Sequence, residues 1–166
     1  VHSEVGFKIR HMMVAKSSGR FGKFSGSFDY DGKDFKKWAT KAVIDAASID
    51  TNNSKRDDHL RSPDFFDVAK YPTIEFVSSK VSGWKDGTGK LHGKLTMHGV
   101  TKEVVLDLES VGETSDEKGS RAGFTARGKI DRRDFGIIWN KTLDKGGLSL
   151  GNDVELTLEI EGIAKK

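Results

Sequence analysis

Residues 90–108, KLHGKLTMHGVTKEVVLDL, carry the pattern that decides the fold. Apolar or small residues occupy alternate positions in both halves of this segment: Leu91, Gly93, Leu95, Met97, Val104, Leu106 and Leu108. A period of two is typical of a half-buried strand, and Gly99 with residues 100–102 can turn the chain between two such strands. The segment therefore predicts a β-hairpin with one apolar face. Because a lone hairpin is only marginally stable in water, further strands must cover that face.

Length and composition predict one soluble globular domain that spans residues 1–166. Hydrophobic residues make up 35% of the chain and charged residues 32%, which is unlike a disordered segment. No apolar run approaches the roughly 18 residues that a membrane span requires, so we expect no stable membrane insertion. The formal net charge is +3, with 25 acidic residues interspersed among 28 basic ones. Such a balanced pattern argues against nucleic-acid binding.

Residue counts narrow the fold and exclude several kinds of site. The chain has no cysteine, which excludes a disulfide scaffold, a thiol nucleophile and a cysteine metal site. Ten phenylalanines supply apolar volume without polar atoms that need partners. That content fits either a large core or an apolar cavity. Nineteen glycines against two prolines favour long, sharply bent strands and therefore an all-β fold.

Six further segments alternate in the same way and are predicted as strands: residues 5–9, 20–30, 38–49, 73–84, 121–131 and 154–160. Residues 38–49 are rich in alanine, which favours a helix, but their β-branched side chains favour a strand. Residues 11–14 interrupt the alternation and predict a bulge or bend, and the polar residues 112–120 predict a loop. With the hairpin, the strands number about eight, enough to close an antiparallel barrel around side chains or one small ligand.

Residues 50–72 carry the helical signals of the chain. One of three residues can cap a helix that continues to residue 60: Asn52, Asn53 or Ser54. Ser62-Pro63 marks a second helical start, and Pro72 ends the segment because the residue before a proline avoids helical geometry. We expect a short helical cap around residues 53–68 that lies over one end of the barrel.

Residues 132–150 have no strand period, yet they carry many apolar side chains: Phe135, Ile137, Ile138, Trp139, Leu143, Leu148 and Leu150. A solvated loop would not be so apolar, so we expect this segment to pack across or into an opening of the barrel. Phe135 and Trp139 are candidate ligand contacts, because no strand pattern explains them. Arg132 and Arg133 fit either a turn or a contact with a lipid headgroup.

Separated motifs follow one another along the whole chain: HSEVGF at 2–7, RHMMV at 10–14, GRF at 19–21, FSG at 24–26, IDT at 49–51, RD at 56–57, HL at 59–60, DFFD at 64–67, KYP at 70–72, GKLT at 93–96, HGVTK at 98–102, RDFG at 133–136 and GNDV at 151–154. Their joint order and spacing is highly specific. With these motifs the chain resembles the YceI-like family of polyisoprenoid-binding, lipocalin-like domains.

The resemblance implies an eight-stranded antiparallel lipocalin-like barrel around a long apolar tunnel. Members of the family bind one lipid-like chain, such as an isoprenoid quinone, a polyprenyl compound or a fatty-acid amide. The expected role is transport, storage or sequestration, without catalytic residues, metal or any cofactor besides the bound lipid. Most members are periplasmic or secreted. We expect the same of this chain, which starts at Val1 without an apolar leader, and a cytoplasmic location is the alternative.

The predicted tunnel wall consists of apolar residues on the inward faces of the strands: Phe7, Phe24, Phe28, Ile44, Phe76, Leu95, Leu106, Phe124, Leu156 and Leu158. Four aromatic residues outside the strands would close the ends: Phe65, Phe66, Phe135 and Trp139. Alternation alone favours a packed core over a cavity, whereas the family resemblance favours the cavity. Phe65 and Phe66 fit internal packing and contact with the ligand equally well.

Signals for other chemistry have simpler explanations. The histidines show no paired-ligand spacing, which favours solvated or locally bonded side chains over a metal site. Asp57-Asp58 and the pair Asp131 and Asp134 fit helix caps and turns. No nucleophile elbow, P-loop or dinucleotide motif occurs. Two alternatives stay open: an enzyme acting on a lipid held in the barrel, and a structural or stress-linked interaction module with a filled barrel. A homodimer would cover an apolar mouth.

Overall fold

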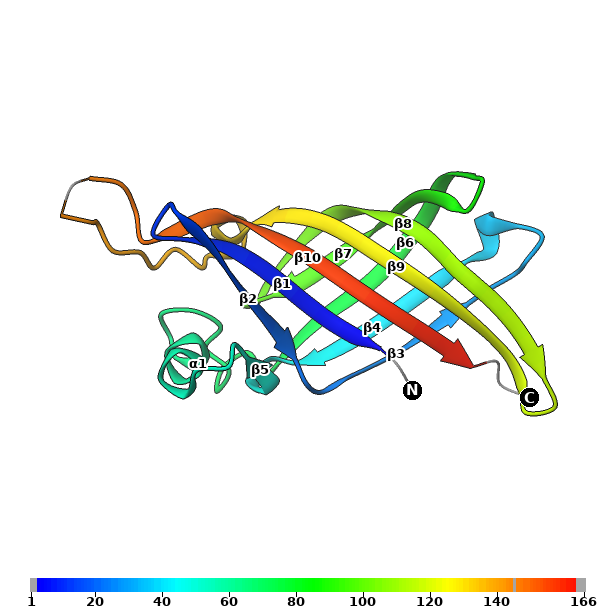
Figure 1. The fold of residues 1–166 in the computed structure, drawn as a ribbon, viewed down its shortest axis with the longest axis horizontal. Coiled ribbons are helices and arrows are strands. Elements are labelled where there is room, and N and C mark those ends of the chain that lie inside the picture. The colour runs from blue at the N-terminus through cyan, green and yellow to red at the C-terminus, as the bar shows by residue number, and fades with distance from the viewer. Residues whose placement is uncertain (1–2, 145, 164–166) are drawn as a thin grey trace.

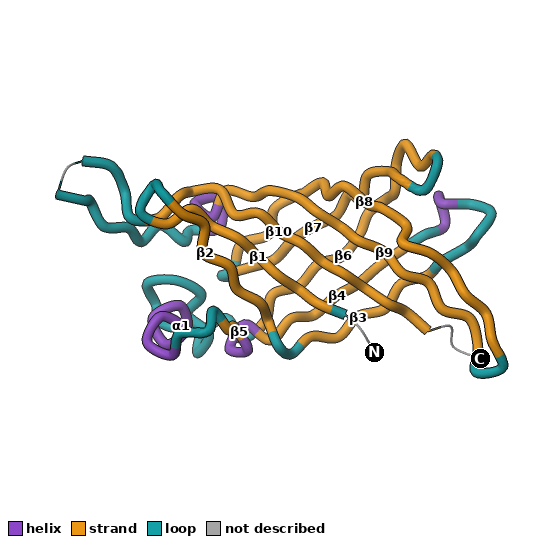
Figure 2. Tube along the Cα trace, viewed as in Figure 1, coloured by secondary structure: helices purple, strands orange, loops and turns teal. Residues whose placement is uncertain are grey.

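The computed structural model describes residues 3–144 and 146–163 as an elongated, strongly curled antiparallel sheet with one short α-helix (Figure 1, Figure 2). The strands are β1 (Glu4–His11), β2 (Ala15–Phe21), β3 (Phe24–Asp29), β4 (Ala39–Asp45), β5 (Ile49–Asp50), β6 (Thr73–Lys85), β7 (Thr88–Met97), β8 (Val100–Asp116), β9 (Gly119–Asp131) and β10 (Leu150–Ile163). The helices are α1 (Ser54–Arg61) and three 3₁₀ turns, η1 (Phe35–Lys37), η2 (Ala46–Ser48) and η3 (Arg132–Phe135). The predicted fold class is confirmed. Within the described ranges, none of the helices has the length and apolar character needed to cross a membrane.

The sheet closes on itself. Its strand order is β3-β4-β6-β7-β8-β9-β10-β1-β2-β5, and all neighbours are antiparallel. The two edge strands of the sheet are β3 and β5. In the chain, β3 directly follows β2, the neighbour of β5, and β5 follows β4, the neighbour of β3, through η2. Backbone hydrogen bonds cross this junction, from Asp45 N to Lys23 O at 2.9 Å and from Gly22 N to Ser48 O at 3.0 Å. If β2 with β3 and β4 with β5 each count as one kinked strand, the ten strands follow the eight paths that were predicted.

Local hydrogen bonds cause the kink at η2. The Asp45 carboxylate accepts a hydrogen bond from Ala47 N at 3.0 Å, and the Ser48 hydroxyl donates to Asp45 O at 2.6 Å. Short polar side chains that bond to nearby backbone compete with sheet pairing. The strand predicted over residues 38–49 is therefore confirmed in β4, but it breaks at η2 before β5.

Two predictions about strand ends are wrong. β2 begins at Ala15, so the strand predicted over residues 20–30 starts too late, and residues 11–14 contain a hairpin turn with Met12 and Met13 at φ values of 53° and 61°. β8 extends to Asp116 and β9 begins at Gly119, so only residues 117–118 form a turn within residues 112–120, which were predicted as a loop. The outer part of β8 is exposed on both faces, so no apolar alternation marks it as a strand.

The hairpin at residues 90–108 is confirmed, with Met97 opposite Val100. Its turn is shorter than predicted, because only His98 and Gly99 lie between β7 and β8, at φ values of 54° and 73°. Two central residues with positive φ are typical of a type I′ turn, whose twist matches that of the strands. Val100 and the two residues after it therefore belong to β8 and not to the turn.

The end of the barrel near α1 combines a helix with two irregular segments (Figure 1). α1 confirms the predicted helix, and Asn53 caps it by accepting a hydrogen bond from Arg56 N at 3.0 Å. The second predicted start, at Ser62-Pro63, gives turns and no helix. Residues 136–144 and 146–149 confirm the predicted irregular segment, in which an isolated bridge joins Thr142 and Leu148.

Candidate functional site

The register of the sheet places all ten predicted wall residues on its inner face. Residues directly opposite one another in antiparallel strands point to the same side. Such pairs link the strands around the barrel: Phe7–Leu156, Leu158–Ala126, Ala126–Leu108, Leu106–Leu91, Leu95–Phe76, Phe76–Ala42, Ile44–Phe24 and Phe28–Thr40. Phe124 lies on the same face, opposite Ile160. The ten side chains thus form one surface, whereas their contact with a ligand stays a prediction.

Side chains on the inner face differ in burial. Phe76 and Leu95 are buried, with 7% exposed, whereas five others are only partly buried: Phe7, Phe24, Phe124, Leu156 and Leu158. The large side chains buried to 1% exposure are Ile49, in β5 beside α1, and Phe135, at the end of η3. Protein cores normally pack at the density of organic crystals. Partial exposure of several inner-face side chains is what a barrel with internal space would give, and that space stays a prediction.

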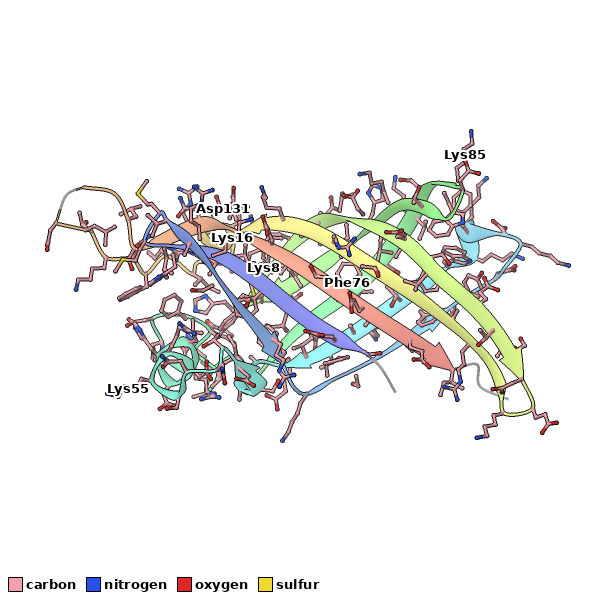
Figure 3. All side chains as sticks on the ribbon, viewed as in Figure 1. Lys8, Lys16, Lys55, Phe76, Lys85 and Asp131 are labelled. Carbon is pink, nitrogen blue, oxygen red and sulfur yellow. The ribbon has the colours of Figure 1, made fainter. Side chains whose placement is uncertain are left out.

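Glycines beside the largest side chains help to keep this space open. A Cβ atom on Gly19 would lie 2.5 Å from Cζ of Phe7, and a Cβ atom on Gly93 would overlap the ring of Phe76. Each ring therefore lies against the backbone of a neighbouring strand, and Figure 3 labels Phe76 near the middle of the barrel. A ring in this position packs against the strand backbone and covers the wall.

Aromatic rings close the end of the barrel opposite α1: Phe28, Tyr30, Trp38, Trp84 and Phe124. The Phe124 ring centroid lies 5.5 Å from that of Tyr30 and 5.6 Å from that of Trp38, and the Trp38 and Trp84 centroids are 4.6 Å apart. Such tilted and edge-on pairs are favourable arrangements of aromatic rings. Three of these residues were not predicted from the sequence to close an end of the barrel: Tyr30, Trp38 and Trp84. Each stands at an end of a predicted strand, and antiparallel pairing of those strands would have placed them together.

The end near α1 is closed by two separate segments. Phe65, in the turns after α1, and Trp139, in residues 136–149, have ring centroids 5.3 Å apart. The His59 ring lies 5.0 Å from Phe65 and 4.8 Å from Trp139. Phe66 packs edge-on against Phe21, with centroids 5.8 Å apart. The structure therefore brings together Phe65 and Trp139, two of the four residues predicted to close the ends.

Arg132 and Phe135 are buried at the base of residues 136–149. His98 Nδ1 donates to the Phe135 carbonyl at 2.9 Å. Arg132, only 3% exposed, donates to three backbone carbonyls at 2.9 Å each: those of Gly151, Ile137 and Trp139. Burial lowers the pKa of its guanidinium. Of the two interpretations offered for Arg132, these contacts show support of the local backbone.

Other polar groups also serve local structure. Asp131 caps η3 by accepting a hydrogen bond from Arg133 N at 2.9 Å, and the Arg133 side chain holds the pKa of this carboxyl below its usual value. Asp57, 7% exposed, accepts a hydrogen bond from Thr51 N at 2.9 Å. Among the residues that the structure describes, no group of three or more His, Cys, Asp or Glu side chains is arranged to hold a metal ion.

Two hollows lie along the barrel wall. The first, of about 540 Å³, is lined by parts of β1, β2 and β10 and includes Glu4, Lys8 and Arg20. The second, of about 380 Å³, is lined by parts of β7, β8 and β9 and includes Lys90 and Asp107. Mixed charges suit neither hollow to a long apolar chain, since covering a charged group without a partner is costly. The inner face is the surface suited to such a ligand.

Known proteins match this chain over nearly its whole length. The sequence model of the YceI-like domain matches residues 1–162. The UPF0312 protein of Serratia proteamaculans is 42% identical over 99% of this chain and 83% of its own length. Protein YceI of Escherichia coli is 41% identical over the same shares.

Solved structures share the fold. BcnA of Burkholderia cenocepacia has a TM-score of 0.85 and 22% identity, with 96% of both chains covered. The YCEI protein of Campylobacter jejuni has a TM-score of 0.81 and 33% identity, covering 96% of this chain and 91% of that one. A polyisoprenoid binding domain from Saccharophagus degradans has a TM-score of 0.70 and 17% identity, covering 98% and 94%. By its sequence, its relatives and its barrel, the chain belongs to the YceI-like domain family.

Proposed function

We propose that this protein binds one long apolar lipid chain inside the barrel and transports, stores or sequesters it. The observation that carries the proposal is the largely apolar inner face, on which side chains of β1, β9 and β10, including Phe7, Phe124 and Leu156, are only partly buried. Family membership and a fold neighbour named as a polyisoprenoid binding domain support the same class of ligand. An isoprenoid quinone, a polyprenyl compound or a fatty-acid amide has the required apolar chain.

Burial of the lipid tail would supply the affinity. Each methylene group removed from water contributes about 0.8 kcal/mol. Ordering of the flexible tail and the loss of translational freedom offset part of this gain. Because an apolar tail needs no hydrogen bonds along its length, we expect the barrel to discriminate lipids more by length than by tail chemistry.

The contacts of the buried polar groups favour binding over catalysis. Asp57 and Arg132 are buried, and their hydrogen bonds join them to Thr51 and to backbone carbonyls. A reaction on the lipid would need an acid, a base or a nucleophile that converges on one point of the bound chain. Most cross-strand pairs on the inner face are apolar or contain glycine. The polar residues in these pairs include Thr40 opposite Phe28, Lys102 opposite Leu95 and Ser110 opposite Phe124.

Mass spectrometry of bound lipid tests the proposal directly. The protein would be purified from its native host without detergent, extracted with organic solvent and measured against its own concentration. We expect a stoichiometric isoprenoid or acyl species, whose mass identifies the ligand. An extract without lipid, followed by no uptake from dispersed quinones, polyprenols and fatty-acid amides, would overturn the proposal and favour a filled barrel with a structural role.

A further inference from the structure

The α1 end of the barrel carries a group of exposed apolar side chains, here called the apolar tip: Met12, Met13, Val14, Ile138 and Leu148. They are five of the ten exposed large apolar side chains in the described part of the chain. Val14 is 88% exposed and Ile138 is 71% exposed. Single apolar residues on a surface are ordinary, whereas grouped ones mark a surface that meets a partner.

The two loops of the apolar tip are joined to each other. Met12, in the β1–β2 turn, donates its N–H to Ser149 O at 2.8 Å. The Met13 sulfur lies against Gly147, where a Cβ atom would overlap it. Figure 1 shows residues 136–144 and 146–149 extending beyond the sheet next to this turn. The tip is therefore one surface built from two distant parts of the sequence.

Buried Arg132 fixes the backbone that presents Ile138. The carbonyls of Ile137 and Trp139, on either side of Ile138, both accept hydrogen bonds from Arg132 Nη1 at 2.9 Å. Ile137 is 4% exposed, so the neighbouring side chain is directed outward. A buried arginine thus holds in place a loop that exposes an apolar side chain to water.

Basic residues flank the β1–β2 turn of the apolar tip, and Glu155 lies opposite Lys8 on the neighbouring strand. Residues 5–28 contain no Asp or Glu, and three of their cations flank the turn: Lys8, Arg10 and Lys16. Figure 3 labels Lys8 and Lys16 on the two strands that lead to it. Lys16 pairs with Glu155 at 2.9 Å, and Asp144 lies near Lys141 in the sequence of the other loop. Among the described residues, Lys8 and Arg10 form no ion pair, so an excess of positive charge adjoins the apolar side chains.

We propose that the apolar tip docks reversibly on an anionic lipid bilayer. Its apolar side chains would enter the headgroup region while the flanking cations meet anionic lipids, which is how interfacial surfaces bind membranes. The inference rests on the proposed function, because a carrier of an apolar lipid exchanges its ligand with a bilayer. The tip also lies at the same end as the contact between Phe65 and Trp139.

Vesicle flotation tests this inference. The wild type would be mixed with vesicles of phosphatidylcholine alone and of phosphatidylcholine with phosphatidylglycerol. We expect binding to the anionic vesicles that weakens as salt is added, because screening shortens the reach of the charges. The double variant Val14→Asp/Ile138→Asp should bind more than tenfold more weakly, since both changes remove apolar surface and add repulsive charge.

A matched control lies on the outer face of β8. Val105 and Val111 are 50% and 72% exposed, and Val105→Asp/Val111→Asp makes the same chemical change away from the tip. The control variant should bind the anionic vesicles to the same extent as the wild type. Lipid uptake from an ethanol dispersion without vesicles, measured on all three proteins, should be equal. If the wild type takes up no lipid in this assay, the proposed function is refuted, whereas the flotation result is unaffected.

Three results would overturn the docking inference. The wild type could stay with the soluble fraction at low ionic strength. The control variant could lose as much binding as the tip variant. Sedimentation equilibrium could instead show a wild-type dimer that Val14→Asp/Ile138→Asp dissociates, which would assign the tip to contact with a second copy of the chain.

Discussion

Two alanines on β4 allow the hollow interior to be tested with a single chemical change. Ala42 is opposite Phe76 on the inner face and is partly buried, whereas Ala39, three residues earlier, is exposed on the outer face. Ala42→Leu adds three carbon atoms to the space in which we propose that the lipid lies. Ala39→Leu makes the same change outside the barrel and serves as the control.

The expected effect follows from the volume that the leucine occupies. If it displaces three carbon atoms of the ligand, each contributing about 0.8 kcal/mol, the binding free energy falls by about 2.4 kcal/mol, or about fifty-fold in affinity. Folding stability should stay the same or rise slightly, because the leucine enters unfilled space. In a packed core the same insertion would lower stability by about 1 to 3 kcal/mol. Affinity and stability together therefore distinguish a hollow barrel from a filled one.

The assay compares the delipidated wild type with both variants. The affinity is obtained by titration with a quinone, with quenching of tryptophan fluorescence as the signal. The stability is obtained from unfolding in urea. We expect Ala42→Leu to lose affinity and keep its unfolding midpoint, and Ala39→Leu to match the wild type in both. A loss of stability in Ala42→Leu alone, or an affinity equal to that of the wild type, would refute the reasoning.

Other features of the structure give sharper local tests. Asn53→Ala removes the α1 cap and should lower the free energy of unfolding by about 1 kcal/mol in urea; an unchanged midpoint contradicts the capping. Asp57→Ala leaves buried hydrogen-bond donors unpaired and should lower the free energy of unfolding by about 1 to 3 kcal/mol. A loss of stability smaller than that of Asn53→Ala would contradict this prediction. The lowered pKa of Asp131 stabilises the folded state above the ordinary value of 3.8, and this contribution is lost as pH falls through the lower folded value. The thermal midpoint of the wild type should therefore fall more steeply in acid than that of Asp131→Asn, and parallel curves would exclude the linkage. Phe65→Cys/Trp139→Cys, joined by a bismaleimide in this cysteine-free chain, should slow lipid uptake at least tenfold, and an unchanged rate would place the ligand path elsewhere.

Sequence alternation predicted most of the strands whose wall separates the interior from water, although the first part of β2 was missed. β10 is the clearest case, because Val154, Leu156 and Leu158 alternate with polar residues and pair with inner-face residues of β1 and β9. A half-buried strand must alternate in this way. The outer part of β8 was missed for the same reason, since both of its faces are exposed and its sequence has no apolar period.

The barrel ends and the state of the interior depend on contacts that local patterns do not contain. Trp38 and Trp84 stand at ends of predicted strands, but their contact becomes visible only once those strands are known to pair as β4 and β6. Alternation is also identical for a filled and a hollow barrel. The two differ only in how the side chains pack in three dimensions, such as the ring of Phe76 against Gly93 of the adjacent strand, and the Ala42→Leu test addresses that difference.

The two ends of the barrel are closed in different ways. This difference predicts the end at which a lipid would enter and the orientation of its tail. At the aromatic end, Tyr30 and Trp38 lie in the segment between β3 and β4, but Phe28, Trp84 and Phe124 lie on β3, β6 and β9 and cannot move apart unless strands of the sheet separate. At the α1 end, Phe65 and Trp139 lie on segments outside the sheet that meet through aromatic rings. They can move apart without breaking a hydrogen bond between strands. We therefore expect a lipid to enter and leave at the α1 end, beside the apolar tip, with its tail directed toward the aromatic rings. The tail length that fits is then set by the distance between the two closures, whereas the headgroup lies where the barrel opens.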